Sequence, residues 1–360
     1  MRGLITILFI VAVSCAVAQD YTISCNIGAD YDGKIAYLIN KSSGDTISSS
    51  VIADGVVEFN GNLDEEALFE VNVNRIKGVV APVFVVKGVN VDVDMTAQPV
   101  RVNDRGGLND KLAAIISRVK ESSARLGARA KQLHDEGKSD EEVLRIMQDD
   151  TDSLYDIYRN AIKENCNNIL GAYLLSRAAR QIYASSAELD AVMAEVKYST
   201  TFNSLKKVRM ALYYGEITKP GNMFVDFSGY SIDGAVSKLS DYVGKGRYVL
   251  VDFWASWCGP CKKEIPSIIE LNRKLSSDKF MTIGINISDI EDKFKAAVAE
   301  LGIDYPQIFV PKNSSDDNNA VILYNVETIP YLILLAPDGT ILERGIRGEE
   351  LEEKITHSLK

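Results

Sequence analysis

The sequence predicts three successive regions: a small antiparallel β-sandwich, a helical region and an α/β domain at the C-terminus. Three observations support this order. Short alternating apolar runs separated by turn residues fill residues 20–103, as in small antiparallel sandwiches. Apolar residues at helical spacing dominate residues 108–214. Strand-like and helix-like segments then alternate over residues 222–360, which indicates a sheet with helices on both faces.

Residues 1–18 have the composition of a secretory signal. Arg2 supplies a positive start, residues 4–13 an apolar core, and the small residues 16–18 a cleavage site. The apolar core is too short to span a membrane. An alternative interpretation is a lipoprotein site in which Cys15 is lipidated. In both cases we expect the protein in the periplasm or cell envelope, where disulfides persist.

The overall composition narrows the class of protein. A chain of 360 residues, of which 46% are hydrophobic, is long and apolar enough for two or three domains. The formal net charge of −10 argues against a nucleic-acid-binding surface, which requires clustered lysine and arginine. We therefore predict no nucleic-acid partner.

Six short strand-like runs divide the N-terminal region, and turn signals such as Asp32-Gly33 and Asp54-Gly55 separate them. The region contains no titratable cluster and no phosphate-binding loop, so we interpret it as a docking or spacer module. The runs are residues 21–27, 34–39, 56–59, 68–73, 83–86 and 89–95.

The helical region contains two capping boxes. Ser139 with Glu142, and Ser185 with Glu188, each have the spacing that marks the start of a helix. The many charged residues are most simply a solvated face. The alternative is a surface that binds a partner or a second copy of the chain, so self-association through the N-terminal or helical region stays open.

The stretch of residues 248–266, YVLVDFWASWCGPCKKEIP, is the most informative in the chain. It begins as a buried strand interrupted only by Asp252, passes through a Cys-Gly-Pro-Cys loop and ends as a helix start, the layout of a dithiol redox site. Cys258 falls at the helix N-cap, where unpaired backbone N–H groups and the helix dipole favour an accessible thiolate. Cys261 lies one turn further in, shielded, and can attack a mixed disulfide held on Cys258.

A CxxC pair has two competing interpretations. It can supply half of a zinc site, but no second CxxC exists and the only histidines are His134 and His357. It can also be a structural disulfide without chemistry. We predict no metal and no cofactor beyond the redox-active disulfide between Cys258 and Cys261.

Two further cysteines would remain in the mature chain. Cys25 alternates with Ile23 and Ile27, so we expect it in a sheet core as a small apolar residue. Cys166 closes a helical stretch. A disulfide between Cys25 and Cys166 is an open alternative.

The C-terminal region alternates in a regular order. The sequence predicts strands over residues 248–253, 280–287, 307–310, 331–335 and 341–344, and helices over residues 260–275, 291–301, 319–324 and 349–359. A Pro-Asp-Gly turn at 337–339 predicts a terminal antiparallel hairpin.

Residues 222–360 resemble the thioredoxin superfamily, and specifically its TlpA/ResA-like extracytoplasmic branch, through the WCGPC motif after a buried strand. The long segment between Ile290 and Val326 matches the extra helix and strand of that branch. Residues 20–103 resemble the β-domain that often precedes such domains in bacterial envelope proteins.

The resemblance implies roles for several residues near the motif. Asp252 would have a raised pKa through burial and would accept a proton from Cys261. Glu264 matches an acid that ResA-like proteins carry near their active site, and a glutamate that merely complements the helix dipole is the alternative. Pro266 matches the kink-forming proline of the family.

The resemblance also implies a substrate-binding wall beside the cysteines. The Ile329–Pro330 bond is expected to be cis and to pack against the cysteines, with the Ile329 backbone pairing with an extended substrate segment. We expect Trp254 beneath the site and Trp257 partly exposed beside Cys258, where Trp257 contacts substrate or is ordinary core material.

Together these features predict an extracytoplasmic thiol–disulfide oxidoreductase acting on a disulfide-containing protein. The Gly-Pro pair is that of thioredoxin, whose potential is about −270 mV against about −120 mV for DsbA, which favours a reductase fed by a membrane electron donor. An oxidase or isomerase using the same cysteines is one alternative, and a partner-binding protein with an inactive thioredoxin fold is another. A peroxidase is disfavoured, because Val251 and Ala255 replace the proline and threonine of the peroxidatic motif.

Overall fold

The computed structural model describes residues 19–73, 80–275, 278–315, 318–346, 353, 355 and 356. The signal region, Cys15, His357 and most of the predicted helix at 349–359 lie outside these residues. The chain divides into two compact units, Met1–Ala178 with Ala194–Phe202, and Ala179–Met193 with Asn203–Lys360. The helical region therefore contributes to both units. Along the described part of the chain, we find no helix with the length and apolar character needed to cross a membrane.

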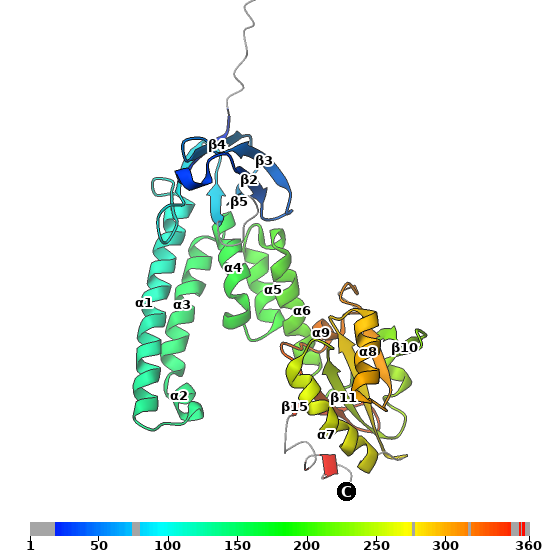
Figure 1. Cartoon of the computed structure of the whole chain (residues 1–360). Coiled ribbons are helices and arrows are strands. Elements are labelled where there is room, and N and C mark those ends of the chain that lie inside the picture. The colour runs from blue at the N-terminus through cyan, green and yellow to red at the C-terminus, as the bar shows by residue number, and fades with distance from the viewer. Residues whose placement is uncertain are drawn as a thin grey trace, which may run out of the picture. The chain divides into compact units, whose positions relative to one another are not determined.

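Two four-stranded sheets form the N-terminal domain (Figure 1). Their strands are β1 (Tyr21–Asn26), β2 (Ile35–Asn40), β3 (Thr46–Val51), β4 (Val56–Gly61), β5 (Ala67–Val73), β6 (Val80–Val85), β7 (Val89–Asp94) and β8 (Arg101–Asn103). The orders are β4-β1-β7-β8 and β3-β2-β5-β6. All the pairs are antiparallel except β1 with β7, which are parallel. The small sandwich is as the sequence predicted, but one pair is parallel, and the six predicted runs did not include β3 and β8.

The core of the sandwich lies between the inward-facing residues of the two sheets, among them Ile23, Leu38, Phe59 and Val71. Cys25 is buried in this core, as its alternation with isoleucines predicted. Its thiol and that of Cys166 are free, so the alternative of a bridge between these two cysteines is wrong for this structure. Burial raises the pKa of the Cys25 thiol to about 12, which makes it an inert apolar residue.

The helical region comprises α1 (Leu108–Asp135), α2 (Asp140–Ile146), α3 (Gln148–Glu164), α4 (Ile169–Ile182), α5 (Ser186–Glu195) and α6 (Asn203–Ile217). The capping box of Ser139 and Glu142 forms as predicted. Ser185 also caps its helix, since its hydroxyl accepts from the Glu188 N–H at 3.1 Å, but the Glu188 carboxylate accepts from the Ala184 N–H instead of closing a box.

One buried amide fastens α1 to the sandwich. The Asn109 side chain donates to the Phe84 carbonyl at 2.7 Å and accepts from the Phe84 N–H at 2.9 Å, so both backbone groups of this β6 residue are satisfied. Asp104 accepts from the Asn109 side chain and backbone at 3.0 and 2.9 Å. Because Asn109 and Phe84 are buried, water cannot replace these bonds.

A seven-stranded mixed sheet with the order β10-β9-β13-β12-β11-β14-β15 forms the C-terminal domain. The elements are β9 (Ser228–Tyr230), β10 (Val236–Lys238), β11 (Tyr248–Trp254), α7 (Gly259–Leu275), β12 (Phe280–Ile287), α8 (Glu291–Leu301), β13 (Gln307–Val310), α9 (Ala320–Leu323), β14 (Tyr331–Leu335) and β15 (Ile341–Ile346). β11, β12 and β13 are parallel, and β14 and β15 are antiparallel to their neighbours. This is a thioredoxin fold, as the sequence predicted, with β9 and β10 as additions.

The central strand β11 divides the core into two layers. Val249, Val251 and Phe253 face one hydrophobic cluster, which includes residues of α9. Leu250 and Trp254 face the other, which includes both cysteines and apolar residues of α7 and α8. Because side chains alternate along a strand, Asp252 points into the second layer, on the cysteine side of the sheet.

We predict that Asn109→Ala destabilises the N-terminal unit by about 2–4 kcal/mol, because it leaves the buried Phe84 N–H and carbonyl without their hydrogen-bond partner. Urea unfolding followed by far-ultraviolet circular dichroism measures the loss. Asn90→Ala is the matched control, since Asn90 is exposed on the neighbouring β7. Equal midpoints for the two variants would contradict the anchoring role of Asn109.

Candidate redox site

The two cysteines of the CxxC motif are joined at the start of α7. Cys258 and Cys261 form a disulfide with an S–S distance of 2.04 Å and a Cα–Cα distance of 5.3 Å. Cys258 immediately precedes the helix, and the backbone N–H of Cys261 donates to its Sγ at 3.2 Å. The sulfur therefore occupies the place of an N-cap acceptor, where helix N–H groups stabilise negative charge.

A groove of about 500 Å³ opens beside one of these sulfurs. Cys258 belongs to its lining and Cys261 does not, which distinguishes the two cysteines as predicted. The sequence led us to expect an accessible Cys258, however, and in the disulfide form this residue is only 4% exposed, against 1% for Cys261. The surrounding walls account for this, since residues from the start of α7, the end of β12, α9 and the loop before β14 lie around the sulfur: Trp257, Gly259, Pro260, Ile287, Ser288, Val321, Val326, Glu327, Thr328 and Ile329.

The loop before β14 forms the wall closest to the sulfur. The Ile329–Pro330 peptide bond is cis, and the Ile329 carbonyl oxygen lies 3.7 Å from Cys258 Sγ. Pro330 is buried, whereas Thr328 is exposed in the groove. The structure thus brings the Ile329 backbone to Cys258 and makes the Ile329–Pro330 bond cis, as the resemblance implied.

Asp252 is a buried carboxylate with one hydrogen bond. The Tyr305 hydroxyl donates to its Oδ2 at 3.3 Å, and its Oδ1 has no hydrogen-bond partner among the described residues. Burial, and then the charge of Glu264, raise the pKa of Asp252 to about 7, while the Tyr305 hydrogen bond acts in the opposite direction. Asp252 can therefore exchange a proton near neutral pH.

Glu264 lies on α7 and is half-buried. The charge of Glu264 is the second cause, after burial, of the raised pKa of Asp252. In the described structure no hydrogen bond joins it to either cysteine. Pro266 lies inside the same helix, as predicted.

The two tryptophans occupy different environments. Trp254 is fully buried, and its indole N–H donates to Gln307 Oε1 at 2.9 Å. Trp257 is 62% exposed in the groove wall, with its indole N–H donating to the Ser288 carbonyl at 3.0 Å. Trp254 is core material, and Trp257 is a large apolar surface next to Cys258.

Sequence reasoning missed Asp289, which fixes the loop before the motif. The N–H and hydroxyl of Ser256 donate to its carboxylate at 2.6 and 2.8 Å, and the Ile290 N–H donates at 2.8 Å. Burial favours the neutral carboxyl, but these hydrogen bonds outweigh it and lower the pKa of Asp289. One signal was available: Asp289 follows β12, and the carboxyl ends of parallel strands meet at one sheet edge.

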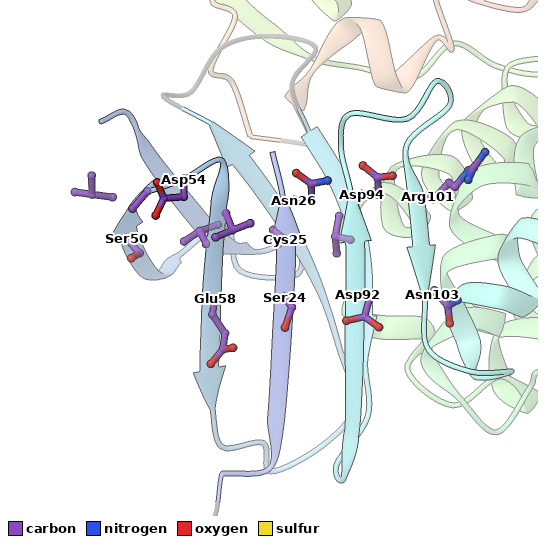
Figure 2. A pocket seen from close by; sticks show the side chains of 15 residues that line it. Ser24, Cys25, Asn26, Ser50, Asp54, Glu58, Asp92, Asp94, Arg101 and Asn103 are labelled. Atoms are coloured by element: carbon purple, nitrogen blue, oxygen red, sulfur yellow. The ribbon is translucent and has the colours of Figure 1, made fainter. Parts of the chain in front are cut away.

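The N-terminal unit has a larger hollow that carries no comparable chemistry. This space of about 970 Å³ is lined by residues of β1, β4, β7 and β8 and of β3 from the other sheet, and Glu58, Ser24, Asp92 and Asn103 form a row across four of these strands (Figure 2). The nearby Cys25 is buried and inert. Within the residues that the structure describes, no cluster of histidine, cysteine, aspartate or glutamate is placed to hold a metal ion.

Comparisons with known proteins cover the C-terminal domain. Residues 220–344 match the sequence model of the AhpC/TSA family. The chain is 28% identical over 158 residues to the thiol-disulfide oxidoreductase ResA of Bacillus thuringiensis subsp. konkukian, covering 42% of this chain and 87% of that protein. It is 33% identical over 115 residues to the thiol:disulfide interchange protein HelX of Rhodobacter capsulatus, covering 32% and 60%.

Among solved structures, the thioredoxin domain of a thiol-disulfide oxidoreductase from Bacteroides vulgatus matches with 27% identity and a TM-score of 0.37, covering 39% of this chain and 99% of that one. The two sequence matches, to the AhpC/TSA model and to ResA, support a thioredoxin-like C-terminal domain with ResA-like relatives. The resemblance of residues 20–103 to an envelope β-domain stays a prediction.

The buried Asp252 predicts a specific dependence of stability on pH. Its pKa is about 7 in the folded chain, above the ordinary value of 3.8, so the folded state holds a proton that the unfolded chain has released. Its contribution is therefore present below pH 4 and is lost as the pH rises towards 7. Asp252→Asn should stabilise the C-terminal unit at pH 8 by up to about 4 kcal/mol more than at pH 4.

Urea unfolding followed by tryptophan fluorescence measures this difference, because both tryptophans lie in the C-terminal unit. Glu270→Gln, an exposed acid on α7, is the control and should show little change at either pH. The prediction is wrong if Asp252→Asn changes stability equally at pH 4 and pH 8.

Proposed function

We propose that this chain is an extracytoplasmic disulfide reductase that acts by dithiol exchange through Cys258 and Cys261. The observation that carries the proposal is the cysteine pair at the tip of α7, with Cys258 Sγ accepting from the Cys261 N–H and lining a groove. The relatives named thiol-disulfide oxidoreductase and thiol:disulfide interchange protein support the same chemistry.

The reaction begins from the reduced pair. The Cys258 thiolate attacks one sulfur of a substrate disulfide, the substrate S–S bond breaks, and the other substrate sulfur leaves as a thiolate that takes up a proton. Cys261 then gives up its proton and attacks Cys258 Sγ. The bond between Cys258 and Cys261 forms, the second substrate thiol is released, and two electrons have passed from protein to substrate.

We assign Asp252 as the group that accepts the thiol proton of Cys261. Its side chain lies on the cysteine side of β11, and its pKa of about 7 lets it accept a proton near neutral pH. Glu264 acts on this step through charge, since a negative Glu264 favours the protonated form of Asp252. Both roles are proposals that rest on the buried position of Asp252.

The substrate is a disulfide-containing protein segment that lies in the groove between Trp257 and Ile329. Trp257 supplies exposed apolar area, and the backbone of Ile329, next to the cis bond to Pro330, pairs with the extended segment. The Gly-Pro pair between the cysteines favours the reducing direction. Outside the cytoplasm a reductase needs electrons, so we propose a membrane partner as donor, with the N-terminal and helical regions available for docking or self-association.

The cysteine variants test the proposal. Wild-type protein should catalyse insulin reduction by dithiothreitol, and Cys258→Ser should abolish catalysis because it removes the nucleophile. Cys261→Ser should leave substrates covalently attached to Cys258, which mass spectrometry after trapping in cell-envelope extracts detects. Cys166→Ser is the control and should behave as wild type, since Cys166 is a free cysteine of the other unit. Equal rates for wild type and Cys258→Ser would contradict the proposal.

A further inference from the structure

The groove wall that faces Cys258 is a short loop between α9 and β14. Val326, Glu327, Thr328 and Ile329 line the groove, and the loop ends at the Ile329 carbonyl, 3.7 Å from Cys258 Sγ. Any shift of this loop therefore changes the space in which a substrate disulfide must approach the sulfur.

An arginine distant in sequence holds this loop. The Arg180 guanidinium, at the end of α4, donates to Asn325 Oδ1 at 3.1 Å and forms an ion pair with the Glu327 carboxylate. Asn325 has a φ of 47°, in the left-handed region that asparagine tolerates better than most residues. Arg180 and the loop belong to the same compact unit.

The start of the loop is fixed separately from within the thioredoxin fold. Arg344 of β15 donates to the Tyr324 carbonyl and, at 2.8 Å, to the Thr218 carbonyl. Its guanidinium also lies 5.8 Å from the centre of the Tyr331 ring. Arg344 thus anchors Tyr324, the first residue of the loop, whereas Arg180 contacts Asn325 and Glu327, which follow it.

Charge adds a second role for the Arg180 contact. Among the described residues that line the groove, Glu327 and Cys258 are the ones with ionisable side chains. Arg180 neutralises Glu327, so the groove presents apolar and uncharged surface to a bound segment. Without Arg180, the carboxylate would face the groove unpaired and would attract cations.

We propose that Arg180 is a positioning residue for substrate binding, which sets the shape and charge of the groove for extended segments with uncharged residues beside the disulfide. This inference rests on the proposed function and deepens it. The Arg180 and Glu327 side chains are 35% and 65% exposed, and ion pairs of that exposure contribute little to global stability. The effect of Arg180 therefore falls on substrate binding rather than on folding.

The test measures KM and kcat with two synthetic peptide disulfides, one flanked by uncharged residues and one by lysines, and with a small aromatic disulfide that does not fill the groove. For Arg180→Ala we expect KM for the uncharged peptide to rise about threefold to tenfold, with kcat and the rate on the small disulfide unchanged. KM for the lysine-flanked peptide should rise less or fall. Arg180→Lys should restore part of the effect, because it keeps the charge but loses the fork of donors.

Two controls separate positioning from loss of an ion pair. Arg209→Ala removes a comparable surface pair, with Asp190 in the same unit, and should leave all parameters unchanged. Glu327→Ala should raise KM for the uncharged peptide as Arg180→Ala does, and the double variant should add less than the sum of the two. If Arg180→Ala does not fold, Glu327→Ala still tests the ion pair, because it removes the other partner.

An unchanged KM in Arg180→Ala and Glu327→Ala, or an equal rise in Arg209→Ala, overturns the inference while leaving the proposed function intact. If wild-type protein reduces neither the peptides nor the small disulfide, the proposed function itself fails, and the inference fails with it.

Discussion

The hydrogen bond from the Cys261 N–H to Cys258 Sγ is the interaction on which the proposed chemistry of the C-terminal domain depends. It places one sulfur at the positive end of α7 and the other inside the first turn. β11 brings the chain to that point, and the Asp289 carboxylate fixes Ser256 two residues before Cys258. Strand β11, the contact of Asp289 with Ser256 and the start of α7 therefore together position the sulfur atom of Cys258.

Two opposing effects act on that sulfur. Burial favours a neutral thiol, as the pKa of about 12 for Cys25 shows in a sheet core that offers no helix terminus. Cys258 is almost as buried, but it has a helix N-terminus beside it and a groove in front of it. On the proposed mechanism, local charge stabilisation rather than exposure alone makes Cys258 reactive, whereas Cys25 is inert.

Much of the C-terminal domain was predictable because its information is local. The strands at 280–287, 307–310 and 331–335 and the helix at 291–301 have the predicted bounds, since apolar periodicity and turn residues define them. The features that sequence reasoning missed depend on contacts between distant segments. The parallel pairing of β1 with β7, the bonds from Ser256 to Asp289 and the Arg180 contact with Glu327 join residues separated by dozens of positions or more, and no periodicity encodes them.

The most direct test of the central claim is the pH dependence of alkylation at Cys258 in the fully reduced protein. Iodoacetamide labelling at a series of pH values, with each cysteine followed separately by mass spectrometry, gives the apparent pKa of Cys258, with Cys166 as an internal comparison. Stabilisation by the helix terminus predicts a midpoint near 7 or lower, well below the value of about 8.5 for a free thiol. A midpoint at or above about 8.5 would contradict it, because burial would then outweigh the contact with the helix.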